Sequence, residues 1–170
     1  MRIKTAILAT FLIAAASGCT TPYTNKELQN IFNAKGLETV EREQGLVVFL
    51  PGVFFEFNKA DLSQPARMKV SEIASIANDP HVVERKLLIE GHTDSSGSYE
   101  YNLELSNRRA ETVHQALLAG KVADSRMSTR GYGEKYPIAD NLKADGSPNP
   151  VGQAKNRRVE VVVKNPENDQ

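Results

Sequence analysis

Two amphipathic helical patterns, each placed between short strand-like runs, limit the folds open to this chain more than any other feature of its sequence. The first opens at residues 63–65, with a proline in its first turn, and ends at residues 78–80. The second runs from about residue 100 to 119 and is terminated by Gly120. Their core-facing stripes consist, in order, of Ala66, Val70, Ile73 and Ala77, and of Leu103, Ser106, Ala110, Val113 and Leu117.

Strand-like runs flank these helices at residues 46–50, 86–90, 127–131 and 158–163. After Pro51 we expect a kink and then a second strand in which Val53, Phe55 and Phe57 share a face. A long loop at 134–150 and a short helical turn near 151–156 precede the last strand. The order β-α-β-α-β-(loop)-β predicts an α+β fold with two crossover units, whose helices pack on one face of a mixed sheet.

A shorter helical pattern precedes the first strand. It covers residues 25–34, with Leu28, Ile31 and Phe32 on one side. Runs at 37–43 and 46–50, separated by Gln44-Gly45, predict a hairpin. The chain thus divides into a targeting segment (1–18), a tether with the short helix and hairpin (19–44), a main domain (45–164) and a disordered tail (165–170).

The first eighteen residues form a targeting segment. A basic start with Arg2 and Lys4 precedes the apolar run 6–16, whose roughly eleven residues are too few for a bilayer that needs ~20. The sequence Ala16-Ser17-Gly18-Cys19 resembles the lipobox of bacterial lipoproteins, which implies cleavage before Cys19 and acylation of its thiol, for example with palmitate. Thr20 follows rather than aspartate, so the resemblance implies the outer membrane, with the domain facing the periplasm.

Cysteine and charge content exclude several classes of protein. Cys19 is the only cysteine, so no internal disulfide can form and the fold must rest on its core. Basic and acidic residues number 21 each, and loss of Arg2 and Lys4 with the targeting segment leaves a slightly acidic chain. There is no basic stripe with interleaved aromatic residues, so a nucleic-acid partner is not expected.

The segment 91–110 joins a strand end, an acidic polar loop and a helix that carries an arginine. Asp94 follows the strand end, where loops of an open sheet usually build sites. Asn102 and Arg109 are seven residues apart, so they share a helical face only ~20° out of register. Asp94 can accept from an ammonium and Arg109 can engage a carboxylate bidentately, so together they can hold a zwitterion.

Several motifs between residues 46 and 163 carry a family resemblance. In order they are Phe55-Glu56-Phe57-Asn58, Gly91-His92-Thr93-Asp94, Asn102, Leu105-Ser106, Arg109-Ala110, Gly131-Tyr132-Gly133 and Asn156-Arg157-Arg158-Val159. In this order and spacing they resemble the OmpA-like peptidoglycan-binding domain. The resemblance implies a domain without catalysis or cofactor, which grips the diaminopimelate of peptidoglycan stem peptides noncovalently, in a cleft at one end of the sheet.

The ligand-binding residues implied by this resemblance are Asp94, Arg109, Asn102, Asn58, Lys59 and Thr93. Asn102 either bonds the ligand or braces the loop, and both roles stay open. Asn58 and Lys59 follow the first core strand, although many family members carry aspartate just before or at this point. Thr93 is expected to position Asp94.

Structural roles are the alternative for the charged residues. Asp94 and Arg109 could form a salt bridge that stabilises the loop, and could pair when the site is empty. Arg157 and Arg158 point to opposite faces of a strand. We expect one of them to brace the Asp94 loop or other acidic residues.

Two other kinds of site fit the same segment less well. His92 and Asp94 suggest a metal site, but the other two histidines lack ligand spacing to His92, and we expect no metal. His92, Asp94 and Ser95 could supply a hydrolytic set. Triads usually join distant segments rather than one loop, so we do not expect an enzyme.

The sequence predicts an outer-membrane lipoprotein that binds diaminopimelate-type peptidoglycan and tethers the outer membrane to the cell wall. The alternative is an envelope regulator whose main partner is a periplasmic protein, with wall binding as its localisation or input. Residues 25–42 discriminate the two. Exposure of Leu28, Ile31 and Phe32 would favour the regulator, and packing of that face onto the domain would favour the tether.

Overall fold

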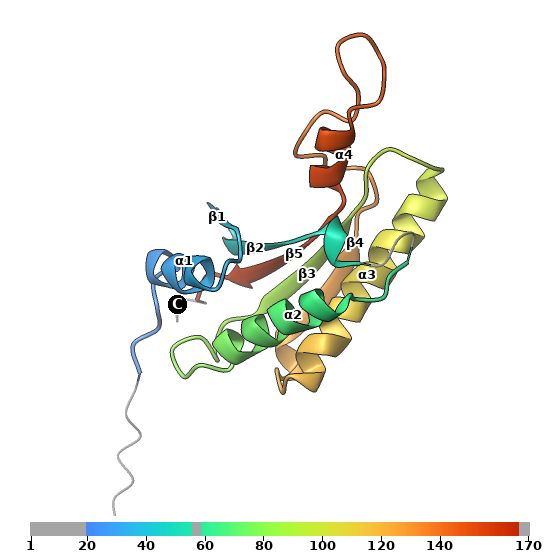
Figure 1. Ribbon diagram of the computed structural model, residues 1–170. Coiled ribbons are helices and arrows are strands. Elements are labelled where there is room, and N and C mark those ends of the chain that lie inside the picture. The colour runs from blue at the N-terminus through green and yellow to red at the C-terminus, as the bar shows by residue number, and fades with distance from the viewer. Residues whose placement is uncertain (1–19, 56–58, 167–170) are drawn as a thin grey trace, which may run out of the picture.

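A five-stranded sheet organises the fold of the computed structural model, which describes residues 20–55 and 59–166 (Figure 1). The strands are β1 (Thr39–Arg42), β2 (Gly45–Pro51), β3 (Leu87–His92), β4 (Met127–Gly131) and β5 (Arg158–Lys164). Their order across the sheet is β1-β2-β5-β3-β4. β5 is antiparallel to both β2 and β3, whereas β3 and β4 are parallel, so the predicted mixed sheet is confirmed.

Three helices cover one face of this sheet: α1 (Asn25–Ala34), α2 (Gln64–Ala77) and α3 (Tyr99–Ala119) (Figure 1). The packing of α2 and α3 on one face was predicted, whereas α1 was assigned to a tether. Ser63 caps α2 by accepting a hydrogen bond from the Ala66 N–H, which fixes where the helix begins. The predicted stripes are buried in the core, with Leu103 alone only partly covered. They pack against side chains of the central strands that include Leu50, Ile89, Val159 and Val161.

α1 belongs to the folded body rather than to a free tether. Leu28 and Phe32 are fully buried in the main core, and Ile31 packs against it. Before the helix, the Tyr23 N–H donates to the His81 carbonyl at 3.1 Å, and the two rings stack with centroids 4.5 Å apart. The domain boundary expected at residue 45 therefore falls inside a continuous structure.

The hairpin of β1 and β2 turns one residue earlier than predicted. Arg42 pairs with Gly45, so the two turn residues are Glu43 and Gln44. Gly45 has a φ of 147°, and an added Cβ would lie 2.2 Å from the Val163 carbonyl oxygen. β2 can therefore begin beside β5 only with glycine at this position.

The second strand predicted after Pro51 is wrong within the described residues. Gly52–Phe54 forms a single turn of 3-10 helix, η1, and Phe55 makes only an isolated bridge. Val53 is 78% exposed while Phe55 is buried. Proline has no N–H to donate, so the ladder of β2 ends at Pro51 and the chain leaves the sheet. Phe57 lies outside the described residues.

α4 (Pro150–Asn156) and the long loop before it stand at one end of the sheet (Figure 1). Asn156 is completely buried, and its Oδ1 accepts from the N–H groups of Ile138 and Ala139 at 2.8 and 3.1 Å. One buried amide thus fixes the loop against α4.

The last described residues are more ordered than expected. Asn165, placed in a disordered tail from the sequence, donates its N–H to the Gln44 carbonyl and its side-chain amide to the Glu43 carbonyl. Residues 167–170 lie outside the described chain. Among the helices of residues 20–55 and 59–166, none combines the length and the apolar character that crossing a bilayer requires.

Substitution of Phe32 tests whether α1 belongs to the folded body. Because Phe32 is fully buried, Phe32→Ala should lower the free energy of unfolding by about 3–5 kcal/mol in urea denaturation. Asn30→Ala, on the exposed side of the same helix, is the matched control and should change it by less than about 0.5 kcal/mol. If Phe32→Ala and Asn30→Ala had equally small effects on the free energy of unfolding, α1 would not be packed on the folded body.

Candidate ligand-binding site

A cleft of about 690 Å³ opens at one end of the sheet, where the loop after β3 meets η1, the start of α3 and the end of α4. Its walls include Pro51, Gly52, Val53, Phe55, Thr93, Asp94, Ser96, Tyr101, Asn102, Leu105, Arg109, Ala154 and Arg157. Four of the six predicted ligand-binding residues therefore line one cavity. Lys59 stands beside it and contributes its backbone, and Asn58 lies outside the described residues.

The crossing of α3 over β3 shapes this cleft. An added Cβ on Gly91 would lie 2.0 Å from the Ser106 carbonyl oxygen, so only glycine lets the helix cross the strand this closely. The Ser106 hydroxyl accepts from the Gly133 N–H at 2.9 Å. The Gly133 carbonyl in turn accepts from the Thr93 N–H at 2.9 Å. These contacts hold the loop after β3 against the segment that follows β4.

Asp94 forms the anionic wall of the cleft. Its side chain is 9% exposed, and its Oδ1 accepts from the Ser96 N–H at 2.9 Å. Its Oδ2 pairs with Nη1 of Arg157, whose side chain is 41% exposed. The expectation that Arg157 or Arg158 braces the Asp94 loop is confirmed, and the alternative of a direct Asp94–Arg109 salt bridge is not what the described residues form.

Arg109 forms the cationic wall. It is only 5% exposed, its Nε donates to the Lys59 carbonyl at 3.2 Å, and its guanidinium carbon lies 5.0 Å from the centre of the Phe55 ring. Burial lowers the pKa of Arg109 from its ordinary value, although arginine stays a cation at neutral pH. No carboxylate pairs with Arg109 within the described part of the chain, so an anionic ligand group would relieve its desolvation.

Asn102 and Thr93 act differently from each other. The buried Asn102 side chain donates to the Asp94 carbonyl at 3.3 Å and to Glu134 Oε2 at 2.6 Å, which is the bracing role left open by the sequence. Glu134 was not anticipated, because it is 32 residues away and no local spacing indicates it. The Thr93 hydroxyl is buried at the cleft and finds no hydrogen-bond partner among the described residues.

A buried charge cluster lies on the opposite face of the sheet. Glu160 is completely buried and accepts from Arg42 Nη1 at 2.6 Å and from Arg158 Nε at 2.7 Å. Burial raises the pKa of this carboxyl, but the hydrogen bonds and charges of the two arginines outweigh burial, and the net shift is downward. Arg157 directly precedes β5 in an extended conformation, and successive residues of an extended chain point to opposite faces, so Arg157 serves the cleft and Arg158 the cluster.

His92 belongs to a group of potential metal ligands and makes no hydrogen bond to Asp94 in the described chain. Glu90, His92 and Glu160 bring potential ligand atoms within 4.8 Å of one another. Arg42 donates to both oxygens of Glu160, so the positive charge of its guanidinium would repel a metal cation there. Both ring nitrogens of His92 are buried without a partner in the described chain, so His92 is hydrogen-bonded neither to Asp94 nor to Ser95.

Comparison with known proteins identifies relatives of this chain. The model of the OmpA family matches residues 54–150, which is more than half of the chain. "Probable lipoprotein YiaD" of Escherichia coli strain K12 is 28% identical over 138 residues, covering 81% of this chain and 59% of the relative. The chain spans less than two thirds of the length of the curated relatives that it matches.

Solved structures show the same fold. The peptidoglycan-associated lipoprotein from Burkholderia pseudomallei is 29% identical, with a TM-score of 0.54 over 64% of this chain and 86% of that one. The cell wall anchor of the T6SS from Pseudomonas aeruginosa is 25% identical, with a TM-score of 0.66 over 85% of this chain and 99% of that one. The predicted α+β architecture with helices on one face is thus shared with both proteins.

The buried His92 makes stability depend on pH. Burial lowers the pKa of His92 from 6.5 to about 4, so between these values the unfolded chain binds a proton that the folded chain excludes. The free energy of unfolding should therefore fall as the pH drops from 6.5 to 4, by up to ~1.4 kcal/mol per unit. His92→Phe keeps a ring against Tyr132 and removes this contribution. The free energy of unfolding is measured by denaturation from pH 7 to 4 for the wild type and for His92→Phe. Parallel curves of free energy against pH for the two proteins would contradict this prediction.

Proposed function

Because the chain belongs to the OmpA family, we propose that it is an outer-membrane lipoprotein that binds peptidoglycan noncovalently through the diaminopimelate of the stem peptide. In this role it tethers the outer membrane to the cell wall and catalyses no reaction. The names of two similar proteins, a probable lipoprotein and a cell wall anchor, are consistent with this proposal.

The observation that carries the proposal is a cleft with one anionic and one cationic wall. Asp94 and Arg109 both line this cleft, and both are nearly buried. The free end of diaminopimelate carries an ammonium and a carboxylate on one carbon, which match these two groups. A lysine side chain in the same place offers the ammonium alone and leaves Arg109 unsatisfied, at a cost of about 1–3 kcal/mol.

The other predicted residues support this pair. Arg157 and the Ser96 N–H orient the Asp94 carboxylate, and Asn102 holds the backbone of the same loop. The Thr93 hydroxyl is buried without a partner among the described residues, and we keep Thr93 among the ligand-binding residues on the family resemblance alone. The Lys59 backbone positions Arg109, and we keep the Asn58 side chain as a ligand contact on the family resemblance alone.

Membrane attachment is assigned to Cys19, which lies outside the described residues together with the targeting segment. The folded body begins almost at once after it, since the Thr20 hydroxyl already donates to the Pro80 carbonyl at 3.0 Å. Two or three acyl chains on Cys19 would hold such a domain stably at the membrane. Single links of about micromolar strength, ~−8 kcal/mol, become a strong tether through avidity when many copies meet one polymer.

The regulator alternative loses its structural support. It depended on an exposed apolar face in residues 25–42, yet Leu28 and Phe32 of that segment are fully buried. The described surface of α1 therefore gives no reason to prefer a periplasmic protein as the main partner.

Retention on isolated cell walls tests the proposed function. The wild-type chain should be retained on diaminopimelate-type peptidoglycan and about 5- to 150-fold less on lysine-type peptidoglycan, because Arg109 would lack its carboxylate. Asp94→Ala and Arg109→Ala should each abolish retention on the diaminopimelate wall. Bound protein is quantified by sedimentation with the insoluble wall.

Arg108→Ala is the matched control for this experiment. Arg108 neighbours Arg109 on α3 but is exposed and pairs with Glu104, so its loss should leave retention unchanged. If wild type, Asp94→Ala and Arg109→Ala all failed to bind either wall, peptidoglycan would not be the ligand of this cleft.

A further inference from the structure

A recess of about 410 Å³ lies at the opposite end of β3 from the cleft. Arg85 stands just before this strand and Asp94 just after it, so the strand separates the two cavities. Figure 1 shows the loop between α2 and β3 and the helix α4 at opposite ends of the sheet. We call the cavity the Arg85 recess, and its walls include Thr20, Pro80, His81, Val83, Glu84 and Arg85.

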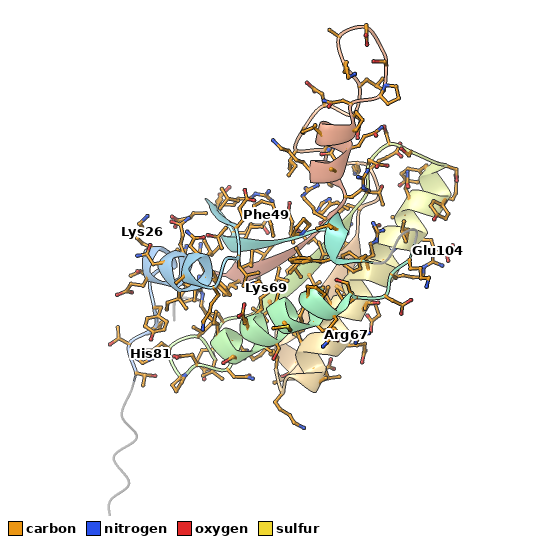
Figure 2. The ribbon with its side chains drawn as sticks, viewed as in Figure 1. Lys26, Phe49, Arg67, Lys69, His81 and Glu104 are labelled. Atoms are coloured by element: carbon orange, nitrogen blue, oxygen red, sulfur yellow. The ribbon has the colours of Figure 1, made fainter. Side chains whose placement is uncertain are left out.

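The start of the described chain forms one wall of the Arg85 recess. The Thr20 hydroxyl donates to the Pro80 carbonyl at 3.0 Å, and Figure 2 labels His81 beside this end of the chain. Thr20 directly follows Cys19 in the sequence, so the Cα atoms of these two residues are only ~3.8 Å apart. With acyl chains on Cys19, as the proposed function assigns, the recess lies at the membrane surface.

Arg85 carries a hydrogen-bond donor that the described chain leaves unsatisfied. The residue is only 2% exposed, its Nε donates to the Lys164 carbonyl at 2.6 Å, and its Nη2 donates to Asn25 Oδ1. Its Nη1 is buried and has no hydrogen-bond partner among residues 20–55 and 59–166. Because an unpaired buried donor of a charged group is costly, an acceptor that enters the recess would stabilise Arg85.

Arg126 shows that a structural role alone would not require this free donor. It packs against the same loop, and its Nε, Nη1 and Nη2 donate to the carbonyls of Arg85, Ala77 and Val82 at 3.0 to 3.2 Å. Every nitrogen of the Arg126 guanidinium is therefore used to hold the loop, whereas Arg85 keeps one nitrogen for a further acceptor.

The exposed carboxylate of Glu84 limits which acceptor suits the recess. A simple anion would be attracted by Arg85 and repelled by Glu84, because both line the same cavity. A ligand with a phosphate and an ammonium satisfies both groups, since the phosphate accepts from a guanidinium and the ammonium donates to a carboxylate. The phosphoethanolamine headgroup of a phospholipid carries this pair of charges.

The size and the apolar walls of the recess also suit such a headgroup. Its volume falls within the roughly 300–1,000 Å³ that is typical of small-molecule sites. Pro22, Pro80 and Pro166 line it, and Val83 at its edge is 37% exposed. These side chains can pack against the glycerol carbons that link a headgroup to its acyl chains.

We propose that the Arg85 recess binds the phosphoethanolamine headgroup of a membrane phospholipid. The phosphate accepts a hydrogen bond from Arg85 Nη1, and the ammonium pairs with the carboxylate of Glu84. This inference rests on the proposed function, because acylation of Cys19 is what brings the recess to the membrane.

A bound headgroup would orient the whole domain. Acyl chains on Cys19 alone attach the chain at one point, about which the domain can turn. The headgroup adds a second point on the loop between α2 and β3. Since the cleft lies at the other end of β3, it is then directed away from the membrane and toward the cell wall.

Native mass spectrometry of the full chain, purified from membranes in a phosphate-free detergent, tests the site. Phosphatidylethanolamine and phosphatidylglycerol are added in equal amounts. The acylated wild type should retain one phosphatidylethanolamine, with about tenfold preference over phosphatidylglycerol, which has no ammonium for Glu84. Arg85→Gln should lower the retention of both phospholipids about tenfold. Glu84→Gln should remove the preference between them.

Arg67→Gln is the matched control for these variants. Arg67 is exposed on α2 and lies outside the walls of the recess, so its loss should leave lipid retention unchanged. Because Arg85 also holds the Lys164 carbonyl, Glu84→Gln at the exposed wall is the decisive variant if Arg85→Gln does not fold.

The same mass spectra separate failure of the recess from failure of the proposed function. An acylated wild type without bound phospholipid, or a preference for phosphatidylethanolamine that survives in Glu84→Gln, would overturn the headgroup site and leave the anchor intact. Displacement of the phospholipid by an equal concentration of inorganic phosphate would assign the recess to free phosphate instead. A chain without the mass of acyl groups would contradict membrane attachment at Cys19, and the headgroup site with it.

Discussion

The contact between α3 and Gly91 is the constraint on which the candidate site depends. The Ser106 backbone sits where any side chain on residue 91 would be, so helix and strand are locked at one crossing point. Asp94 stands three residues beyond Gly91, and Arg109 three residues beyond Ser106. Asp94 on the strand side and Arg109 on the helix side therefore both lie three residues from the same contact.

The register of β5 links the two faces of the sheet. Glu160 is fully buried between Arg42 and Arg158 on one face, while Arg157 reaches Asp94 on the other. Buried ion pairs contribute little net stability, but leaving one partner unpaired is costly, so they penalise wrong pairings. A slip of one residue would send every side chain of β5 to the opposite face, which would break both the cluster and the brace on Asp94.

Elements fixed by local spacing could be predicted from the sequence, and long-range contacts could not. The apolar stripes located α2 and α3, and the family resemblance predicted that Asp94, Asn102 and Arg109 line one cleft. The turn η1 was mistaken for a strand, because alternation of apolar residues continues there although the ladder ends at a proline. The partner of Asp94 stayed undecided among Arg109, Arg157 and Arg158, since the actual partner, Arg157, lies 63 residues away and is placed by the start of β5.

The cleft is proposed to bind both the ammonium and the carboxylate at the free end of diaminopimelate. NMR of the arginine Nε–H groups tests this most directly. Free meso-diaminopimelate and lysine would each be titrated into the labelled protein. The account predicts that diaminopimelate shifts the Nε–H resonance of Arg109 together with the Ser96 amide beside Asp94, whereas lysine leaves Arg109 unchanged. If the Arg109 Nε–H resonance did not shift with diaminopimelate, or shifted equally with lysine, binding of both charged groups by the cleft would be contradicted.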